Sequence, residues 1–325
     1  MALLPFACLG IGILVGVFNR SKRFLGVSDR VATVSLILLM ATIGTNIGMN
    51  ESIMSRFSNI GFNCIVISIS TILFSVMITY CFERTLLPLE EIDKDLKLRK
   101  LSLENHLLDE LQEIDSQASN EKKITGLVWI MPSSILFGLL FGFLLRKKLE
   151  GFDVNFIFTI FLIILYICVG INQGSNREVF LFIKELGFKV IWLPVAILAG
   201  SLIGGIVSGI LLHIPFNVSV MSAAGMSFYS ITGAYMTQAY GVEIGTYGFL
   251  VNVLREFFTI LFMPILIKIS KGSPIAGGAS GNMDTMLAPV TKFVGAELGL
   301  VTLITGTILT FLVPLLLPAL YAIQQ

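Results

Sequence analysis

Residues 244–267 read IGTYGFLVNVLREFFTILFMPILI, and the only charged side chains in this run are Arg255 and Glu256 at its centre. A helix needs about 20 predominantly apolar residues to cross the hydrocarbon core of a bilayer, so the run predicts a spanning helix. A charge at the bilayer centre costs about 2.5–3.5 kcal/mol on insertion scales. The pair therefore indicates a working site inside the membrane, unless neighbouring helices and backbone hold each side chain.

The composition of the whole chain also favours a membrane protein. Of 325 residues, 55% are hydrophobic and 13% are charged, against about 25% charged in an ordinary soluble domain. The formal net charge of +1 argues against a nucleic-acid partner. The sequence has no Walker loop, dinucleotide fingerprint or nucleophile–base pair. We therefore expect neither an enzyme nor an ATP-driven pump, and no cofactor.

The four cysteines show no CxxC spacing and lie in or beside apolar runs, so we expect small buried side chains rather than a disulfide or a metal site. His106 and His213 also have no metal-ligand company in the sequence. The sequence therefore predicts no metal centre.

Eight segments predict spanning helices, and two further stretches predict re-entrant hairpins in an all-α polytopic membrane protein. The expected spans are 3–18, 31–49, 61–82, 124–145, 154–171, 188–212, 244–267 and 298–321. The stretches 215–240 and 274–296 are rich in Ser, Gly, Thr and Ala and carry polar runs. Backbone that breaks at membrane depth is tolerated only inside protein or beside a water-filled cavity. Each limb of such a hairpin would have roughly 10 residues and reach about half-way across.

The basic residues predict the orientation in the inner membrane. The first apolar run is followed by Arg20, Lys22 and Arg23, the reverse of the charge order in a signal peptide. Cytoplasmic loops carry an excess of Lys and Arg, which places both termini outside and favours the hairpin model. The polar stretch 83–123 has Leu and Ile at helical spacing and predicts a cytoplasmic linker helix.

The first half of the chain contains a three-helix unit that occurs twice. A shift of 126 residues lays Gly44, Asn46, Gly48 and Asn50 on Gly170, Asn172, Gly174 and Asn176. These residues either serve a site or simply cap and kink their helices. Because three spans is an odd number, the second copy would be inverted. We therefore expect repeat 1 at 1–82, linker 83–123 and inverted repeat 2 at 124–214.

The remaining chain, 215–325, predicts a transport core of hairpin, helix, hairpin and helix. A shift of 54 residues lays the segment 234–266 on 288–320, with Gly241 meeting Gly295 and Pro264 meeting Pro318. Inverted repeats with broken membrane helices are the design of secondary transporters, which bind substrate near the midplane. Chance similarity between apolar segments is the alternative for both repeats.

The central helix carries a polar stripe made of Asn252, Glu256 and Thr259. Their spacing of four and three residues places them on one face. The stripe suits an ammonium group, a proton or a cation. Arg255 projects elsewhere and suits a carboxylate, either from a substrate or from Asp284. The second repeat has Leu309 and Thr310 at the positions of the pair, so one helix should carry the ionisable chemistry.

The centres of the two hairpins are the next candidates. Ser230 and Thr232 lie midway along the first hairpin, and Asn282, Asp284 and Thr285 lie midway along the second. Short helical limbs that end at the midplane present amides to anions and carbonyls to cations. Asp284 is equally compatible with an N-cap for the second limb. Glu51 is either a second membrane carboxylate or an interfacial, solvated acid.

Three motifs resemble the bacterial lysine exporter family LysO. They are the glycine–aromatic–serine pattern at 222–233, Asn252-Val253-Leu254-Arg255-Glu256, and Gly278-Ala279-Ser280-Gly281-Asn282-Met283-Asp284. The resemblance covers most of the chain and implies export of L-lysine and close analogues, in exchange for protons. It also implies eight spans with both termini outside, and membrane-embedded acids at Glu256 and, with looser spacing, Glu51. The layout is in addition similar to that of glutamate transporters.

The leading hypothesis is therefore a proton-coupled exporter of lysine in the lipid bilayer, with a homo-oligomer left open. An alternative within transporters is a sodium-coupled carrier of a carboxylate or anionic amino acid, anchored by Arg255. An alternative from another class is a channel-like or structural membrane subunit that needs a partner.

Overall fold

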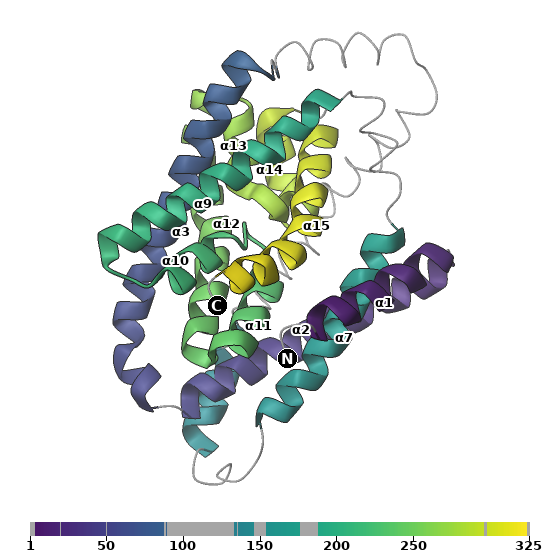
Figure 1. Ribbon diagram of the computed structural model, residues 1–325, viewed down its shortest axis with the longest axis vertical. Helices are drawn as coiled ribbons and strands as arrows, with labels where there is room; N and C mark the ends of the chain where they lie inside the picture. Colours follow the sequence, from purple (N-terminus) through teal and green to yellow (C-terminus); the bar gives the residue numbers. More distant parts are fainter. Residues whose placement is uncertain are drawn as a thin grey trace.

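The computed structural model describes residues 4–19, 21–49, 51–87, 89, 133–134, 136–145, 154–175, 188–295 and 298–323 (Figure 1). Within these ranges every regular element is a helix, which confirms the all-α prediction for this part of the chain. Of the predicted linker helix at 83–123, the structure describes only residues 83–87 and 89. Residues 83–85 belong to the end of α3 (Glu51–Thr85), and the rest of the prediction lies outside the described residues.

Six of the described helices are long and apolar enough to cross a membrane. They lie in α2 (Lys22–Met49), α3, α7 (Val154–Ser175), α9 (Trp192–Leu212), α12 (Val242–Ile269) and α15 (Gly299–Ile323). The spans expected at 3–18 and 124–145 correspond to shorter apolar helices at Ala7–Phe18, within α1 (Leu4–Phe18), and at Leu136–Leu145. Eight spans therefore remain a prediction, of which six are supported by length and composition.

The start of α2 differs from the prediction in a way that matters for the site. The helix begins at Lys22, whereas the sequence reading placed its start at residue 31, after the charged residues Asp29 and Arg30. The Asp29 carbonyl accepts a hydrogen bond from the Thr33 hydroxyl inside the helix. A charged side chain does not end a helix when the backbone around it stays hydrogen-bonded. Asp29 therefore lies on a face of α2 rather than in a loop.

Both stretches predicted as hairpins are broken near their middle into short helices. The first consists of α10 (Phe216–Ala223) and α11 (Tyr229–Tyr240), and the second of α13 (Gly272–Gly278), the 3₁₀ turn η2 (Ala279–Met283) and α14 (Leu287–Val294). Each helix is far shorter than the roughly 20 residues of a spanning helix. We call residues 224–228 tip 1 and residues 279–286 tip 2.

Three of the four non-glycine residues with positive φ in the described part of the chain lie in the tips. Met226 and Ser227 in tip 1 have φ values of 46° and 75°, and Ala279 in tip 2 has a φ of 49°. Residues other than glycine rarely adopt positive φ, and such backbone tends to cluster at functional sites. The tips also touch, because the amide and hydroxyl of Ser280 both donate to the Met226 carbonyl, at 2.9 and 2.6 Å.

In each broken stretch the last short helix ends at a glycine, and the 54-residue shift pairs these two glycines. Gly241 follows α11 with a φ of 92°, and Gly295 follows α14 with a φ of 102°. Glycine is the residue that reaches positive φ at no steric cost, so it ends a helix and redirects the chain. The 54-residue shift in the sequence therefore pairs two glycines that share one structural task.

Two helix contacts follow the 126-residue spacing. A Cβ on Gly12 of α1 would collide with the Ile167 carbonyl of α7, and a Cβ on Gly138 would collide with the Ala41 carbonyl of α2. Gly138 stands 126 positions after Gly12, and Ala41 stands 126 positions before Ile167. Small residues allow close helix approach in membranes, so the same packing device occurs at two places in the fold.

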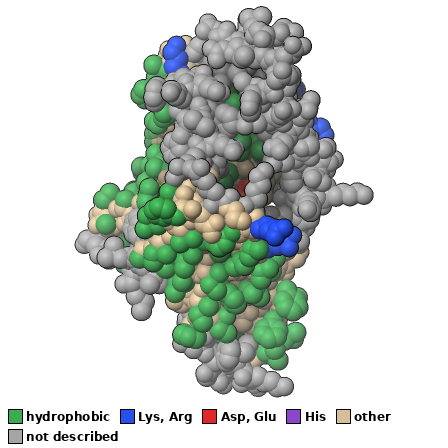
Figure 2. Space-filling model, turned by 90° about the vertical axis from the view of Figure 1, so that its right-hand side faces the viewer, with side chains coloured by type: hydrophobic (Ala, Val, Ile, Leu, Met, Phe, Trp, Pro, Cys, Tyr) green, Lys and Arg blue, Asp and Glu red, His purple; other side chains and the backbone are tan. Residues whose placement is uncertain are grey.

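The helices form two groups in Figure 1, where α1, α2 and α7 pack together and α3 and α9 pack against each other beside the core helices. The core consists of α10 to α15, and α12 contacts α3, α11 and α13. Hydrophobic side chains dominate the described surface in Figure 2, as expected of helices that face lipid. The two tips lie between these groups and face α2 and α7.

Candidate functional site

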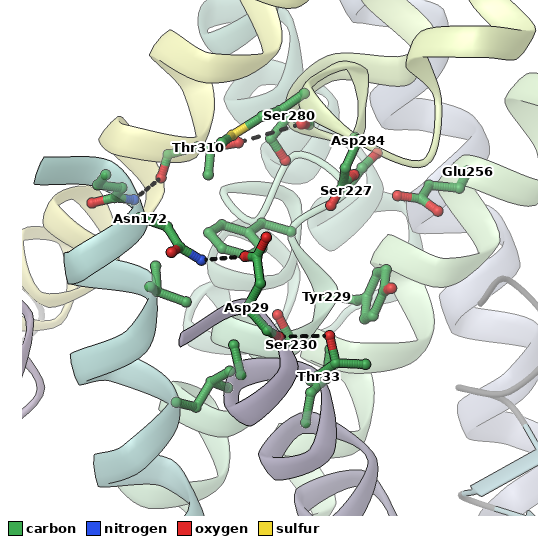
Figure 3. Close-up of a pocket in the computed structure, with 18 residues that line it drawn as sticks. Asp29, Thr33, Asn172, Ser227, Tyr229, Ser230, Glu256, Ser280, Asp284 and Thr310 are labelled. Atoms are coloured by element: carbon green, nitrogen blue, oxygen red, sulfur yellow. Dashed lines mark hydrogen bonds between the residues drawn. The ribbon is translucent and has the colours of Figure 1, made fainter. Parts of the chain in front are cut away.

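A cavity of about 340 Å³ lies between the α2–α7 pair and the two tips (Figure 3). Pockets for small molecules typically measure about 300–1,000 Å³, so its size suits a ligand such as an amino acid. The cavity is lined by Asp29, Ala32, Thr33, Leu36, Leu165, Val169, Asn172, Gln173, Ser227, Phe228, Tyr229, Ser230, Glu256, Ser280, Gly281, Met283, Asp284 and Thr310.

The Asp, Glu, Lys, Arg and His side chains of this described lining are all acids. They are Asp29 from α2, Glu256 from α12 and Asp284 from tip 2, and no Lys, Arg or His belongs to the described lining. Unlike charges attract more strongly away from bulk water, where the effective dielectric constant is lower. We therefore expect the cavity to attract a cation.

Glu256 is the buried acid on the spanning helix, at 8% exposure. The Thr285 hydroxyl donates to its Oε1 at 3.1 Å, which links α12 to tip 2. A Cβ on Gly281 would lie 2.7 Å from the same oxygen, so the absence of a side chain at 281 leaves room for the carboxyl group. The structure thus brings the predicted Thr285 into contact with Glu256, which lines the cavity.

Asp284 lies at the cavity rather than at the start of the second limb. The N-cap of α14 is Met286, which makes no side-chain capping bond, so the N-cap alternative for Asp284 is not observed. The carboxyl group instead accepts from the backbone amide of Thr285 within tip 2. The predicted residues Glu256, Asp284 and Ser230 therefore share one cavity, as Figure 3 shows.

Arg255 does not belong to the described lining of this cavity, and Asp284, one of the two carboxylates that the sequence left open for it, is not among its hydrogen-bond partners. The side chain is 1% exposed, and its guanidinium donates to the Ser201 and Ser75 hydroxyls at 2.8 and 3.2 Å. It also donates to the Ala276 and Gly277 carbonyls at the end of α13, at 3.0 and 3.2 Å. Carbonyls at a helix C-terminus favour a cation. Arg255 thus matches the alternative of a charge held by helices and backbone.

Asn252 and Thr259, the other two residues of the polar stripe on α12, have different surroundings. Asn252 accepts from the Ser227 amide at 2.7 Å and donates to the Ser222 and Gly248 carbonyls at 2.9 and 2.7 Å. It therefore holds tip 1 and does not line the cavity. Thr259 is fully buried beside Gly277, and its hydroxyl has no bonding partner among the described residues.

The remaining predicted residues take supporting positions or lie outside the described side chains. The Thr232 hydroxyl donates to the Phe228 carbonyl at 2.8 Å, and the Asn282 amide donates to the Ile275 carbonyl at 2.7 Å, so both brace the tips from outside the cavity lining. Glu51 begins α3, and its side chain lies outside the described part of the structure.

Several cavity residues were missed by the sequence reading. Asp29 was overlooked because the charges around it suggested a loop, although it stands in α2. Asn172 belongs to the repeated glycine–asparagine motif and donates to Asp29 Oδ1 at 2.7 Å, so that motif reaches the cavity. Ser227 and Tyr229 lie in the glycine–aromatic–serine pattern at 222–233 but were not predicted as site residues, and Gln173 carried no signal that separates it from ordinary polar residues.

Two buried polar atoms at the cavity have no hydrogen-bond partner among the described residues. They are Gln173 Oε1 and Ser227 Oγ, on side chains that are 3% and 2% exposed. Buried polar groups are nearly always hydrogen-bonded in proteins, so unpaired ones at a cavity wall indicate contacts that a ligand supplies. Within the described ranges, no group of three or more His, Cys, Asp or Glu is arranged to hold a metal ion.

Comparison with known proteins gives a consistent result. The family model described as "Lysine exporter LysO" matches residues 6–91 and 133–321. The chain is 27% identical over 215 residues to "Lysine exporter LysO" of Escherichia coli (strain K12), covering 66% of this chain and 68% of that protein. It is 24% identical over 187 residues to the Haemophilus influenzae protein titled "Putative lysine exporter", covering 57% and 93% of the two chains. No solved structure matches the chain.

Proposed function

Because the chain belongs to the lysine exporter LysO family, a family of transporters and not of enzymes, we propose that it exports L-lysine and close analogues from the cytoplasm. The family and the apolar helices make it a multi-pass membrane protein. We place it in the inner membrane with both termini outside, as its basic residues predict.

The cavity with three carboxyl groups and no basic side chain in its described lining is the observation that carries this proposal. Lysine has two ammonium groups and one carboxylate, so its net charge is positive and complements such a lining. An anionic substrate would need a cationic anchor. Arg255, which the anionic alternative requires, is engaged by two serines and two carbonyls away from the lining.

The amino-acid head of lysine fits the wall formed by α11, Glu256 and Asp284. The first turn of α11 begins at Tyr229 in the cavity lining, and its N-cap residue Phe228 makes no side-chain capping bond. Unpaired amides at a helix N-terminus favour an anion, so this turn suits the carboxylate of lysine. The α-ammonium group then lies against the carboxyl groups of Glu256 and Asp284.

Glu256 is also the residue we assign to proton coupling. Thr285 occupies its Oε1, and Oε2 is the oxygen that takes either the ammonium group or a proton. Ionised Glu256 holds the substrate, whereas protonated Glu256 has no charge to offer it. A proton that enters from outside therefore displaces lysine, which gives exchange of one for the other.

Inverted repeats would let the cavity open to either side of the membrane in turn. The matched glycine contacts support a 126-residue repeat, as does the hydrogen bond at 3.1 Å between Ser75 and Ser201, which stand 126 residues apart. The contact between Met226 and Ser280, 54 residues apart, supports the second repeat. Eight spans and two re-entrant hairpins around one midplane site then form an alternating-access carrier.

Lysine counterflow in proteoliposomes tests this function. The purified wild-type chain should accumulate labelled lysine against internal lysine in a saturable manner, and Glu256→Gln should reduce the rate at least 100-fold. Glu243→Gln is the matched control, because Glu243 lies on the same helix outside the cavity lining. Unimpaired, pH-dependent exchange by Glu256→Gln would remove Glu256 from the mechanism. A sodium requirement with indifference to lysine would overturn the proposed substrate.

A further inference from the structure

The cavity wall opposite α11 and Glu256 carries further polar groups. The proposed binding of the amino-acid head does not use them. This wall is formed by α2 and α7, which contribute Asp29, Asn172 and Gln173 to the lining. In Figure 3, Asp29 lies across the drawn pocket from Glu256, and the two residues come from different helices. A ligand that contacts Glu256 at one end therefore meets Asp29 at the other.

Gln173 belongs to the lining at this end of the cavity, and its side chain is buried at 3% exposure. Its side-chain amide nitrogen donates to the Thr310 carbonyl of α15 at 3.1 Å, which fixes the orientation of the side chain. The carbonyl oxygen Oε1 of the same amide has no donor among the described residues. A buried carbonyl oxygen of this kind is complete only when a ligand donates to it.

Asp29 contributes a charged acceptor to the same cavity lining. Asn172 is the neighbour of Gln173 in sequence and donates to Asp29 Oδ1 at 2.7 Å. This neutral donor orients the carboxylate without neutralising its charge. No cationic side chain belongs to the described lining, so the charge is available to a cationic ligand.

The chemistry of these groups fits a primary ammonium. An ammonium group has three donors and no acceptor, so it needs several acceptors around one point. Asp29 and Gln173 Oε1 supply acceptors only, one of them charged. A methyl group at this position would leave Gln173 Oε1 without a donor and the charge of Asp29 without a cationic partner, which is how polar sites reject analogues that lack the matching donor.

We propose that Asp29 and Gln173 bind the side-chain ammonium group of the substrate, and that the site thereby selects amino acids with a terminal amine at a set distance from the α-carbon. This inference rests on the proposed function, because it assumes that Glu256 and α11 hold the amino-acid head. It adds the substrate class, which is that of α,ω-diamino acids, and names the residues that distinguish them from neutral amino acids.

Competition in the counterflow assay tests the inference with the full chain. Unlabelled L-lysine, L-ornithine and L-norleucine compete against labelled lysine, and norleucine has the carbon chain of lysine without the terminal amine. In the wild type, lysine should compete at least 100-fold better than norleucine. In Asp29→Asn this preference should fall at least tenfold, while the half-inhibitory concentration of norleucine changes less than threefold.

A second variant separates recognition from misfolding, because it predicts a gain. Asp29→Glu extends the carboxylate by one methylene group, so the preference should move at least threefold from lysine toward the shorter ornithine. Arg30→Gln is the control, since Arg30 is the next residue of α2 and lies outside the cavity lining. It should leave both preferences unchanged.

The possible outcomes distinguish this inference from the function on which it rests. If the wild type shows no saturable lysine exchange, the proposed function fails and the inference fails with it. If the wild type exchanges lysine but Asp29→Asn keeps its preference over norleucine, the inference alone is overturned. The inference is supported if Asp29→Asn loses the preference for lysine over norleucine and Asp29→Glu shifts the preference from lysine toward ornithine.

Discussion

Arg255 and Glu256 are neighbours on α12, yet they occupy two opposite kinds of surroundings. The guanidinium of Arg255 is enclosed by two serine hydroxyls and two helix-end carbonyls, on the side of α12 that meets α3, α9 and α13. The carboxyl group of Glu256 faces a cavity with two other acids and accepts one hydroxyl. The guanidinium makes four hydrogen bonds within the protein, whereas we propose that the carboxyl group binds a ligand.

The difference shows how a buried charge can be assigned a role. A charge inside a membrane is a functional candidate by default, but saturation by fixed donors and acceptors removes the reason to expect a ligand. Arg255 joins Ser75 of α3 and Ser201 of α9 to the end of α13, so it holds tip 2 in place. We infer that Arg255 positions the site and that Glu256 works in it.

Substitution of Arg255, whose side chain is held by hydrogen bonds within the protein, should have the largest effect on stability. Arg255→Ala leaves two buried hydroxyls and two buried carbonyls without their donor, which should lower the free energy of unfolding by about 3 kcal/mol. Chemical denaturation of the purified protein in detergent measures this change. Arg255→Lys keeps the charge and should recover part of the loss. Wild-type stability combined with lost lysine affinity would contradict the comparison, because it would make Arg255 a ligand.

Asn252 should show the next largest effect, through tip 1. Asn252→Ala removes the acceptor of the Ser227 amide and the donor of two carbonyls, so we expect a loss of about 2 kcal/mol. Hydrogen exchange of the backbone at 224–228 should speed up at the same time. Unchanged exchange at the tip would show that Asn252 does not hold it.

Thr285 should show a smaller effect, since it connects tip 2 to the cavity. Thr285→Val keeps the shape of the side chain and removes the hydrogen bond to Glu256 Oε1. We expect a loss of about 1 kcal/mol in the free energy of unfolding. Thr246→Val is a suitable comparison, because the Thr246 hydroxyl donates to the Val242 carbonyl of its own helix and Thr246 lies outside the described cavity lining. Equal transport defects in both variants would weaken the assignment of Thr285 to Glu256.

Glu256→Gln should have the smallest effect on stability and nevertheless abolish transport. Glutamine retains an oxygen that accepts from Thr285, and it removes a charge that has no cationic partner in the described lining. We expect the free energy of unfolding to stay within about 1 kcal/mol of the wild type. A destabilisation as large as that of Arg255→Ala would show that Glu256 is structural as well.

The sequence predicted those features that depend on local pattern. The apolar run around Arg255 and Glu256 predicts α12, and the small and polar residues at 215–240 and 274–296 predict the two broken stretches. Gly241 and Gly295 matched in the repeat because both end helices at positive φ. In each case the physical cause lies within a few residues of the signal.

Features that depend on distant contacts were not predictable. Arg255 meets Ser75, which stands 180 residues away, and nothing near Arg255 in the sequence indicates that partner. Asp29 was missed because charged residues suggested a loop before α2, while its partner Asn172 lies 143 residues further on. The cavity is formed by six separate parts of the chain, so the set of lining residues follows from packing and not from spacing.

The most direct test of the account is protection of the cavity by lysine. Ser230→Cys places a thiol in the cavity lining, and Thr259→Cys places one beside Gly277, near the Arg255 contacts. Both variants are made with Cys81→Ser, because Cys81 is an exposed thiol. A positively charged thiol reagent should modify Ser230→Cys and not Thr259→Cys, and lysine should slow the modification at least tenfold while glutamate has no effect. Modification of Ser230→Cys at the same rate with and without lysine would contradict the claim that lysine occupies this cavity.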